Sequence, residues 1–487
     1  MTEQTQSPRD AVANQPATPG LAGRLSTFEI VFTVLAFNAP LSVFVGFLPV
    51  VIGYGNQLGA PATFIATGSL LLLFSVGYTA MARRFKNPGG FYAYVSAGLG
   101  KPLGLGAAGV ALLTYLFLLT GSYAYGGLTF QALVQDVFGG PALPWWMYSV
   151  ILLGIVAVLG YFNISLSAKV LTVTMILEVL VIVVFDAVVI FGGGDSGLTT
   201  APFLAEHILS GSIGLAILFG IISMGGFEAT AIFREEARNP ERTIPRATYI
   251  AVAMLSSMYA VTSYALIVGI GPGNVVEATA GDPTTTTLGT IGRYLGVVTQ
   301  DVVTVLLCTS VFAALVAIHN VSARYLYSLS VDRVLPAAVG MAHPRHGSPY
   351  RASMVASGVT LALMVVLSCL GVGPATLYAN LVGIGGYGFL LLMFLTSLAV
   401  IRYFRTNPQF ELGPWRSVIA PILAAVGLLS GIVLASVNIE TLIGGSSALA
   451  AGLLVLFYGS IAGGAVFALR LRRSRPDVYA RIGREGS

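Results

Sequence analysis

The stretch that decides the fold runs from residue 217 to residue 246 and reads ILFGIISMGGFEATAIFREEARNPERTIPR. Its first half is apolar enough for a membrane, yet it contains the pair Gly225 and Gly226 and the acid Glu228. A glycine pair weakens a helix, and an acid at membrane depth is costly unless it faces protein or water. These residues predict a broken helix beside a cavity. The segment from Arg234 to Arg246 is charged and interrupted by prolines, which indicates that the chain leaves the membrane there.

The composition defines the class of protein. Of the 487 residues, 56% are hydrophobic and 9% are charged, whereas a soluble globular domain carries about 25% charged residues. The chain is therefore expected to be a polytopic membrane protein embedded in a lipid bilayer. The formal net charge is +5, but the basic residues lie between apolar runs and form no patch, so we do not expect a nucleic-acid partner.

Catalytic, metal and cofactor sites are not indicated by the sequence. Cys308 and Cys369 sit inside apolar runs without metal-ligand spacing, and the four histidines show no ligand pattern with acids or cysteines. The phosphate-loop pattern GxxxxGK[ST] does not occur. We therefore expect no enzyme, no metal and no cofactor. A channel would need a continuous polar pore lining and a receptor a soluble signalling domain, and neither pattern is found.

Twelve membrane spans are expected when about 20 apolar residues are taken as one crossing. They begin near Phe28, Ala60, Leu103, Trp145, Leu166, Ser212, Ala247, Val297, Ala352, Ala375, Val418 and Ser446. With a cytoplasmic N-terminus the basic residues fall on the inner side, except Arg293. We therefore expect a multi-pass protein of the plasma or inner membrane, with both termini in the cytoplasm. Residues 1–24 are expected to be a disordered tail, 25–472 the membrane domain and 473–487 a second tail.

The first span is also interrupted. Pro40 removes a backbone donor and clashes with the preceding turn, so the helix should be broken there, or kinked and packed against its neighbours. This position lies five spans before the break at residues 225 and 226. The chain is therefore predicted to contain two halves of opposite topology, residues 28–192 and 210–403, followed by two extra helices over 415–472. Interrupted helices at corresponding places in two halves are typical of a transporter site near the bilayer midplane.

Two acids and one tyrosine inside the spans are candidate functional residues. Glu178 and Asp186 lie in the fifth predicted span, where a carboxyl group is expected to be neutral or paired. Glu178 is interpreted equally as a proton carrier and as a structural hydrogen-bond partner. Asp186 lies closer to the outer end and is interpreted as a wetted residue at the mouth. Tyr123, in the middle of the third span, is a candidate ligand contact.

Three segments resemble the amino acid, polyamine and organocation permeases. GFEATAIFREEARNPERTIPRA (226–247) is similar to the sixth span and following loop of that family. RFKNPGGFYAYV (84–95) and SARYLYSLSVDRVLP (322–336) resemble the loops after the second and eighth spans. The resemblance covers nearly the whole chain after the first tail. It implies the leucine-transporter-type fold, an all-α bundle with a five-plus-five inverted repeat and two extra helices.

The resemblance also implies where a substrate would bind. Its carboxylate would meet free backbone amides of the broken first span, at Ala39, Pro40, Leu41, Ser42 and Val43. Its amino group would meet carbonyls of the broken sixth span, at Ile222, Ser223, Gly225 and Gly226, while Phe219 or Phe227 closes over the ligand. The chain departs from the family pattern in having PLSVF where a Gly-Ser-Gly-like triplet is usual.

The sequence leaves the coupling ion open between a proton and a sodium ion. Glu178 occupies roughly the place where many proton-coupled members of the family carry a fifth-span lysine, so we hypothesise that it is the protonatable group. Glu228, beside the sixth-span break, is the second proton candidate. The alternative is a sodium ion held near Ser42 and Thr309 or Ser310, because an alkali ion prefers hydroxyl and carbonyl oxygens.

We therefore expect a secondary transporter that imports a small amino acid or a related amine by proton-driven alternating access. The N-termini of half-helices favour a carboxylate and their C-termini favour an ammonium group, so a zwitterion fits the two breaks. The alternatives are an obligate exchanger of amino acids or amines and a sodium-coupled symporter.

Overall fold

The computed structural model describes residues 26–84, 90–162, 168–228, 230, 237–410, 412–443 and 446–483. These residues are helical with connecting turns, and none of them belongs to a β-strand. Ten of the helices are long and apolar enough to cross a membrane, and the bent pair Thr27–Ala36 and Pro40–Tyr54 makes an eleventh candidate. The prediction of an all-α polytopic membrane protein is confirmed.

The helices follow the predicted spans closely. From the N-terminus they are α1 (Thr27–Asn38), α2 (Pro40–Ser42), the π-helical turn η1 (Val43–Phe47), α3 (Leu48–Tyr54), the 3-10 turn η2 (Gln57–Gly59), α4 (Ala60–Ala82), α5 (Phe91–Leu99), α6 (Lys101–Ala132), the π-helical η3 (Leu133–Val137), α7 (Trp145–Phe162) and α8 (Ala168–Gly192). They continue with the 3-10 turn η4 (Ala201–Phe203), α9 (Ala205–Ile208), α10 (Ile213–Ile222), α11 (Pro240–Ile270), α12 (Val275–Gly281), α13 (Pro283–Leu295), α14 (Val297–Val331) and α15 (Tyr350–Cys369). The last elements are α16 (Pro374–Thr406), the π-helical η6 (Trp415–Ile419), α17 (Ala420–Leu442), α18 (Ser447–Ser474) and α19 (Pro476–Arg481).

The sixth predicted span is the exception. Its described helix, α10, has ten residues and is shorter than a membrane crossing. The start of α10 agrees with the prediction, because Ile213 directly follows Ser212. The start that differs most is that of α11, which begins at Pro240, seven residues before the predicted Ala247.

The centre of the bundle is the contact between α6 and α16. Glycines allow the two helices to approach closely: a Cβ atom on Gly388 would lie 2.1 Å from the Thr114 hydroxyl, and one on Gly385 would lie 2.7 Å from Leu118. Small residues at a helix contact are typical of membrane proteins, where packing replaces the hydrophobic effect between helices. This close contact fixes the wall against which the interrupted helices lie.

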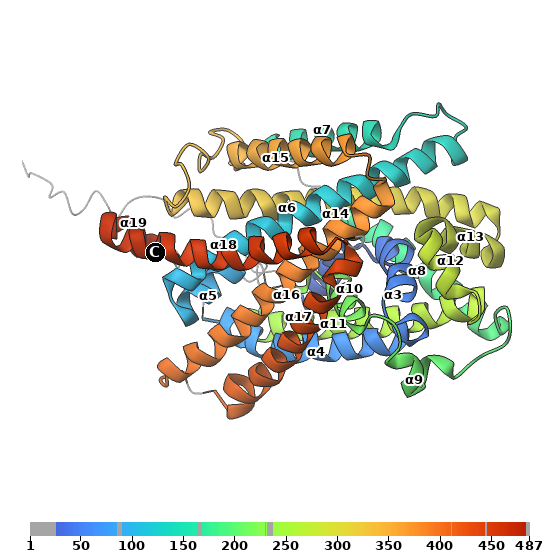
Figure 1. Cartoon of the computed structure of the whole chain (residues 1–487), viewed down its shortest axis with the longest axis horizontal. Helices are drawn as coiled ribbons and strands as arrows, with labels where there is room; N and C mark the ends of the chain where they lie inside the picture. Colours follow the sequence, from blue (N-terminus) through green and yellow to red (C-terminus); the bar gives the residue numbers. More distant parts are fainter. Residues whose placement is uncertain are drawn as a thin grey trace, which may run out of the picture.

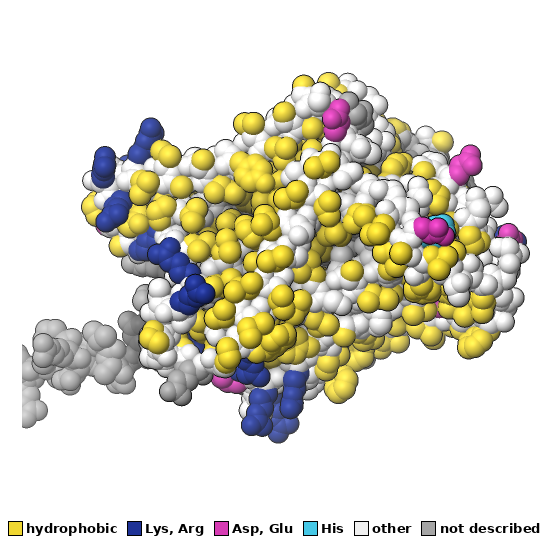
Figure 2. Space-filling model, turned by 60° about the horizontal axis from the view of Figure 1, so that its bottom comes forward, with side chains coloured by type: hydrophobic (Ala, Val, Ile, Leu, Met, Phe, Trp, Pro, Cys, Tyr) yellow, Lys and Arg dark blue, Asp and Glu magenta, His cyan; other side chains and the backbone are white. Residues whose placement is uncertain are grey.

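Many of the long helices, among them α4, α14, α15 and α18, run roughly parallel to one another, whereas α16 and α17 cross the view diagonally (Figure 1). Helices α7 and α15 lie side by side at one edge, and α18 runs along α6. Helix α5, α19 and the C-terminus lie at one end of the molecule, and α9, α12 and α13 lie at the other. Figure 2 shows Lys and Arg side chains on the C-terminal side of one face, next to a broad hydrophobic surface.

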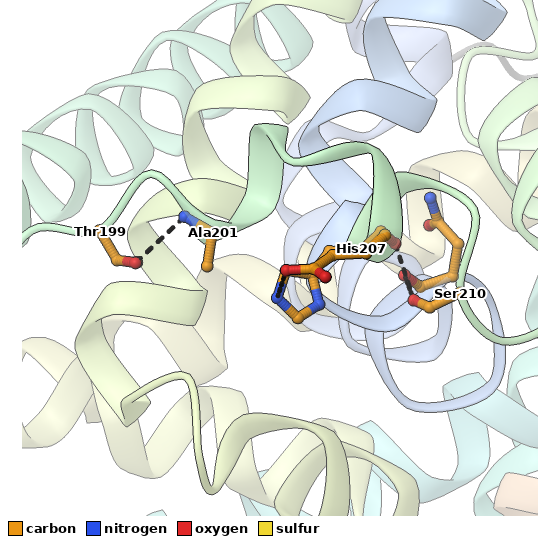
Figure 3. Close-up of polar contacts among 6 residues, drawn as sticks. Thr199, Ala201, His207 and Ser210 are labelled. Carbon is orange, nitrogen blue, oxygen red and sulfur yellow. Dashed lines mark hydrogen bonds and ion pairs between the residues drawn. The ribbon is translucent and has the colours of Figure 1, made fainter.

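The connection from α8 to α10 lies at the opposite end and is held by polar contacts (Figure 3). The N–H of Ala201 donates to the Thr199 hydroxyl at 3.1 Å, and the Ser210 hydroxyl donates to the His207 carbonyl at 2.7 Å. Nearby, Asp195 and Arg293 form an exposed ion pair at 2.5 Å, which raises the pKa of the Arg293 guanidinium. These contacts fix the loop that leads into α10.

Candidate functional site

The first interruption separates α1 from α2. Ala39 adopts the left-handed backbone conformation, with φ 54° and ψ 69°, and Pro40 is the first residue of the next helical segment. Proline has no N–H and disfavours a helical conformation in the residue before it, so the helix breaks here. The segments Thr27–Ala36 and Pro40–Tyr54 are bent by 42°. The interruption predicted at Pro40 is therefore present.

The second interruption follows α10. The helix ends at Ile222, and residues Ser223–Gly226 form a turn in which Gly226 has φ 98°. Only glycine adopts this conformation without strain. The N–H of Gly226 donates to Oε2 of Glu228 at 2.9 Å, so the acid of the motif closes the turn. Residues 229 and 231–236, through which the predicted loop begins, lie outside the described residues.

Asn38, the last residue of α1, joins the two interruptions. Its Nδ2 donates to the carbonyls of Ser223 at 2.7 Å and Gly225 at 2.9 Å. Its Oδ1 accepts a short hydrogen bond from the Tyr259 hydroxyl of α11. Sequence reasoning missed Asn38 as a site residue, although an amide directly before the breaking proline of an apolar span is a usable signal. The two free carbonyls of the turn are thereby satisfied, which fixes the turn against α1.

A cavity of about 150 Å³ lies between the interruptions. Seven of the predicted contact residues line it: Ala39, Ser42, Val43, Ile222, Ser223, Gly225 and Gly226. The lining also includes residues that were not predicted, among them Asn38, Phe47, Tyr115, Ser122, Tyr125 and Tyr378. A cavity of this size, roughly 150 Å³, is large enough for a benzene-sized molecule. The cavity therefore fits a small ligand.

Five other predicted contacts lie outside this lining. Pro40 and Leu41 are buried in α2, and Phe227 is buried against Phe74, with ring centroids 6.0 Å apart. Phe219 lines a neighbouring cavity instead. Tyr123 is buried on a different face of α6, where its carbonyl accepts a hydrogen bond from Ser149 at 2.8 Å. The third-span tyrosines that line the cavity are Tyr115 and Tyr125.

Glu178 lies behind the first interruption. Its side chain is buried, and its Oε2 accepts hydrogen bonds from the Leu41 N–H at 3.2 Å and from the Ser310 hydroxyl at 2.9 Å. Helices α8, α2 and α14 therefore meet at one carboxyl group. Any change in the charge of Glu178 acts directly on the backbone of the interrupted first span.

The hydroxyl groups proposed for a cation are only partly gathered. Ser310 donates to Glu178, and Ser42 is buried with no hydrogen-bond partner for its hydroxyl among the described residues. Thr309 is exposed, and its hydroxyl donates to the Leu306 carbonyl at 2.7 Å. Within the described part of the chain, Ser42 and Ser310 are thus the members of the set that lie beside the first interruption.

The described lining of the cavity includes one acid. Glu228 is the one formally charged side chain among its described lining residues, and its backbone carbonyl accepts a hydrogen bond from Tyr78 at 3.0 Å. The remaining lining is apolar or carries hydroxyl, amide and carbonyl groups. An amine or ammonium group is the ligand chemistry that such a lining favours.

A second cavity, of about 460 Å³, adjoins the first. The two cavities share Tyr125 of α6 and Tyr378 of α16, whose rings stack with centroids 4.3 Å apart and planes 15° apart. Phe47 meets the Tyr378 ring edge-on at 5.5 Å and also lines the first cavity. The aromatic rings therefore form a partition between the two cavities.

Asp186 is not a wetted residue at a mouth, so that interpretation was wrong. Its side chain is 7% exposed, and its Oδ2 accepts a hydrogen bond from Thr262 of α11 at 2.8 Å. The helix position suggested the outer end of the span, but the packing of α11 against α8 covers the carboxyl group.

Comparison with known proteins gives consistent matches along the chain. A family model described as amino acid permease matches residues 25–458. The low-affinity putrescine importer PlaP of Escherichia coli (strain K12) is 25% identical over 334 residues, which cover 67% of this chain and 71% of PlaP. Asc-type amino acid transporter 1 of Mus musculus is 26% identical over 315 residues, covering 62% of this chain and 57% of that protein. The serine/threonine exchanger SteT of Bacillus subtilis is 25% identical over 322 residues, covering 64% and 69%.

Proposed function

This chain belongs to the amino acid permease family, and we propose that it is a secondary transporter that moves a small amino acid or a related amine across the cell membrane by proton-driven alternating access. The observation that carries the proposal is that two interrupted helices meet at one small cavity and are joined there by Asn38. The relatives that match most of this chain are named as an importer of putrescine and an exchanger of serine and threonine. Their named substrates all carry an amino group.

Recognition of the substrate would rest on backbone and hydroxyl groups at the two breaks. Ser42 offers a buried hydroxyl that has no partner among the described residues, and it follows the breaking proline at the start of a helical segment. A helix N-terminus favours a carboxylate. On the other side, Glu228 and the carbonyl ends of the sixth-span turn favour an ammonium group. The site would therefore hold the two charged ends of a zwitterion at different breaks, or an amine at the acidic side alone.

The twelve-span inverted repeat is part of the proposal. Its halves would be residues 28–192 and 210–403, with the two extra helices over 415–472. Supporting it, the short helices α5 and α13 each end at a glycine in a left-handed conformation, Gly100 with φ 99° and Gly296 with φ 89°. In both places a long helix, α6 or α14, begins directly afterwards. The same order of short helix, glycine and long helix therefore occurs twice along the chain, which supports the proposal of two repeated halves.

We place both termini in the cytoplasm. Lys and Arg side chains gather on the side where the C-terminus and α19 lie (Figure 1, Figure 2), and positive charge is enriched on the cytoplasmic side of membrane proteins. Residues 1–24 and 473–487 would then be cytoplasmic tails, with α19 at the start of the second one.

Proton coupling would act through Glu178. In its ionised form the carboxylate accepts the Leu41 N–H and the Ser310 hydroxyl, and a bound proton weakens both contacts at the first interruption. Glu228, which lines the cavity, would bind either a proton or the substrate amine. A sodium ion beside Ser42 and Ser310 is the rival, because it would use the same hydroxyl groups.

The first test is uptake into proteoliposomes of labelled putrescine, L-serine and L-alanine. Each is measured with an imposed proton gradient, a sodium gradient, no gradient, or preloaded substrate. The proposal predicts accumulation under the proton gradient alone, and one pH unit supports about a tenfold substrate gradient for each coupled proton. Accumulation with sodium alone would move the coupling to Ser42 and Ser310. Movement only against preloaded substrate would make the protein an exchanger.

Glu178→Gln tests the coupling residue itself. Glutamine still accepts hydrogen bonds from Leu41 and Ser310 but cannot bind and release a proton. We expect the variant to lose proton-driven accumulation while exchange of internal for external substrate continues. The matched control is Glu440→Gln, which removes an exposed acid of α17. Unchanged proton-driven accumulation in Glu178→Gln would exclude Glu178 as the coupling group.

A further inference from the structure

A second buried acid lies on the same face of α8 as Glu178. Asp186 follows it by eight residues, about 12 Å along a helix axis, and Ile182, midway between them, is fully buried. Asp186 is 7% exposed; its Oδ2 is 2.8 Å from the Thr262 hydroxyl. Its Oδ1 is buried and has no hydrogen-bond partner within the described ranges. Coupling as proposed above makes no use of this group.

No basic side chain compensates a charge on Asp186 in the described part of the chain. The titratable groups on the elements packed against this part of α8 bind elsewhere or lie toward helix ends. Three tyrosines donate to other groups: Tyr259 to Asn38, Tyr264 to the Thr199 carbonyl and Tyr294 to the Gly269 carbonyl. Arg293 pairs with Asp195, Glu29 caps α1 with Ser26, Cys308 donates to the Thr129 carbonyl, and Asp301 is half-buried near the start of α14. A buried acid whose contact is one neutral hydroxyl is costly to ionise.

The Thr262 hydroxyl makes this acid sensitive to a proton. It has a single hydrogen, but two acceptors lie within reach, Oδ2 of Asp186 at 2.8 Å and the Met258 carbonyl at 2.9 Å. When Asp186 is protonated, its O–H donates to Thr262, which donates to Met258. When Asp186 is ionised, Thr262 must turn its hydrogen to the carboxylate and leave the Met258 carbonyl. The protonation state of Asp186 therefore changes a backbone contact of α11.

Helix α11 leads from this contact to the cavity. Tyr259 lies one turn before Thr262, and its hydroxyl donates to Asn38, which binds the carbonyls of Ser223 and Gly225. We propose that Asp186 is a second proton-binding site, and that the proton bound there keeps α11 and Asn38 in the arrangement that holds the substrate cavity together. The proton comes from the aqueous phase and returns to it; no other group is transferred. This inference rests on the proposed transport function.

The inference predicts that the affinity for substrate depends on pH. Mutation should separate this dependence from proton-driven accumulation. In the wild-type protein, substrate affinity should fall as the pH rises, by up to about tenfold per pH unit above the pH at which Asp186 ionises. Asp186→Asn has the shape of the protonated form and cannot ionise, so its affinity should stay high at alkaline pH. Glu178→Gln should keep the pH-dependent affinity while losing proton-driven accumulation.

The experiment measures binding of labelled putrescine or L-serine to purified protein across the pH range, together with the infrared band of protonated carboxyl groups. Asp186→Asn should flatten the affinity profile and remove one titrating component of that band. The matched control, Asp136→Asn, removes an exposed acid of η3 and should change neither.

A second variant keeps the inference testable if Asp186→Asn does not fold. Thr262→Val removes the hydroxyl through which Asp186 acts on α11, so the affinity profile should flatten as it does in Asp186→Asn, while Thr262→Ser should restore the pH-dependent affinity. A wild-type pH profile in both Asp186→Asn and Thr262→Val would overturn the inference even if transport is confirmed. Failure of the wild-type protein to bind or transport any compound of the panel would instead count against the proposed function, and the infrared titration would still report on Asp186.

Discussion

The two interrupted spans break a membrane helix by different backbone chemistry. In the first, a single residue, Ala39, leaves the helical conformation and the chain resumes a helix at Pro40. In the second, α10 ends at Ile222 and is followed by a four-residue turn that ends at Gly226, where φ is 98°. The first break is thus set by a proline and tolerates a side chain, whereas the second depends on a glycine. The two breaks should therefore respond differently to substitution.

The largest effect is expected at Gly226. Valine is sterically excluded from φ 98°, and a residue held in such a region costs about 1 to 3 kcal/mol or forces the backbone to move. Gly226→Val should therefore displace the N–H that binds Glu228 and abolish substrate binding, with the protein still inserted in the membrane. Equilibrium binding of the labelled substrate on purified protein is the measurement.

Gly225→Ala is the matched comparison for that prediction. Gly225 has no positive φ, and a Cβ atom there would lie 3.0 Å from the Ile222 carbonyl oxygen, a contact that a small shift relieves. We expect a moderate loss of affinity. Equal loss in the two variants would mean that space around the turn, and not the conformation of Gly226, controls the second break.

Sequence reasoning located both breaks but not what joins them. Pro40 and the glycine pair are local signals, because each acts on its own backbone, and Glu178 was found because an acid in an apolar span is conspicuous. Asn38 and the Tyr125 and Tyr378 partition depend on contacts between helices that are far apart in sequence. The same limit explains why Tyr123 was chosen instead of Tyr125: both lie in one helix, and only the packing of α6 decides which of them faces the cavity.

The next effect in size is expected at Asn38, the residue that the two breaks share. Asn38→Ala leaves the carbonyls of Ser223 and Gly225 without their donor, and each buried unsatisfied group costs about 1 to 3 kcal/mol. Part of this cost falls on the arrangement of the turn that binds substrate, so substrate affinity should fall by roughly ten- to a hundredfold, which corresponds to about 1.4 to 2.8 kcal/mol. Isothermal titration with the transported substrate is the measurement.

Tyr259→Phe separates the two roles of Asn38. It removes the hydroxyl that orients the amide but leaves both donors to the turn in place, so a smaller loss of affinity is expected. If Tyr259→Phe were as damaging as Asn38→Ala, the amide would act mainly as a link to α11. The geometry of the two breaks would then depend on α11 as well as on Asn38.

The smallest effect is expected at Ala39, where the first break tolerates a side chain. The left-handed conformation costs a non-glycine residue about 1 to 2 kcal/mol, whereas glycine adopts it freely but loses roughly 0.5 to 1 kcal/mol more in conformational entropy on folding. Ala39→Gly should therefore raise the thermal unfolding midpoint slightly and leave substrate affinity within about twofold of wild type, because the break keeps its geometry. A lower midpoint together with lost binding would show that the methyl group of Ala39, which lines the cavity, helps to define the first break. The proline would then not be sufficient to set it.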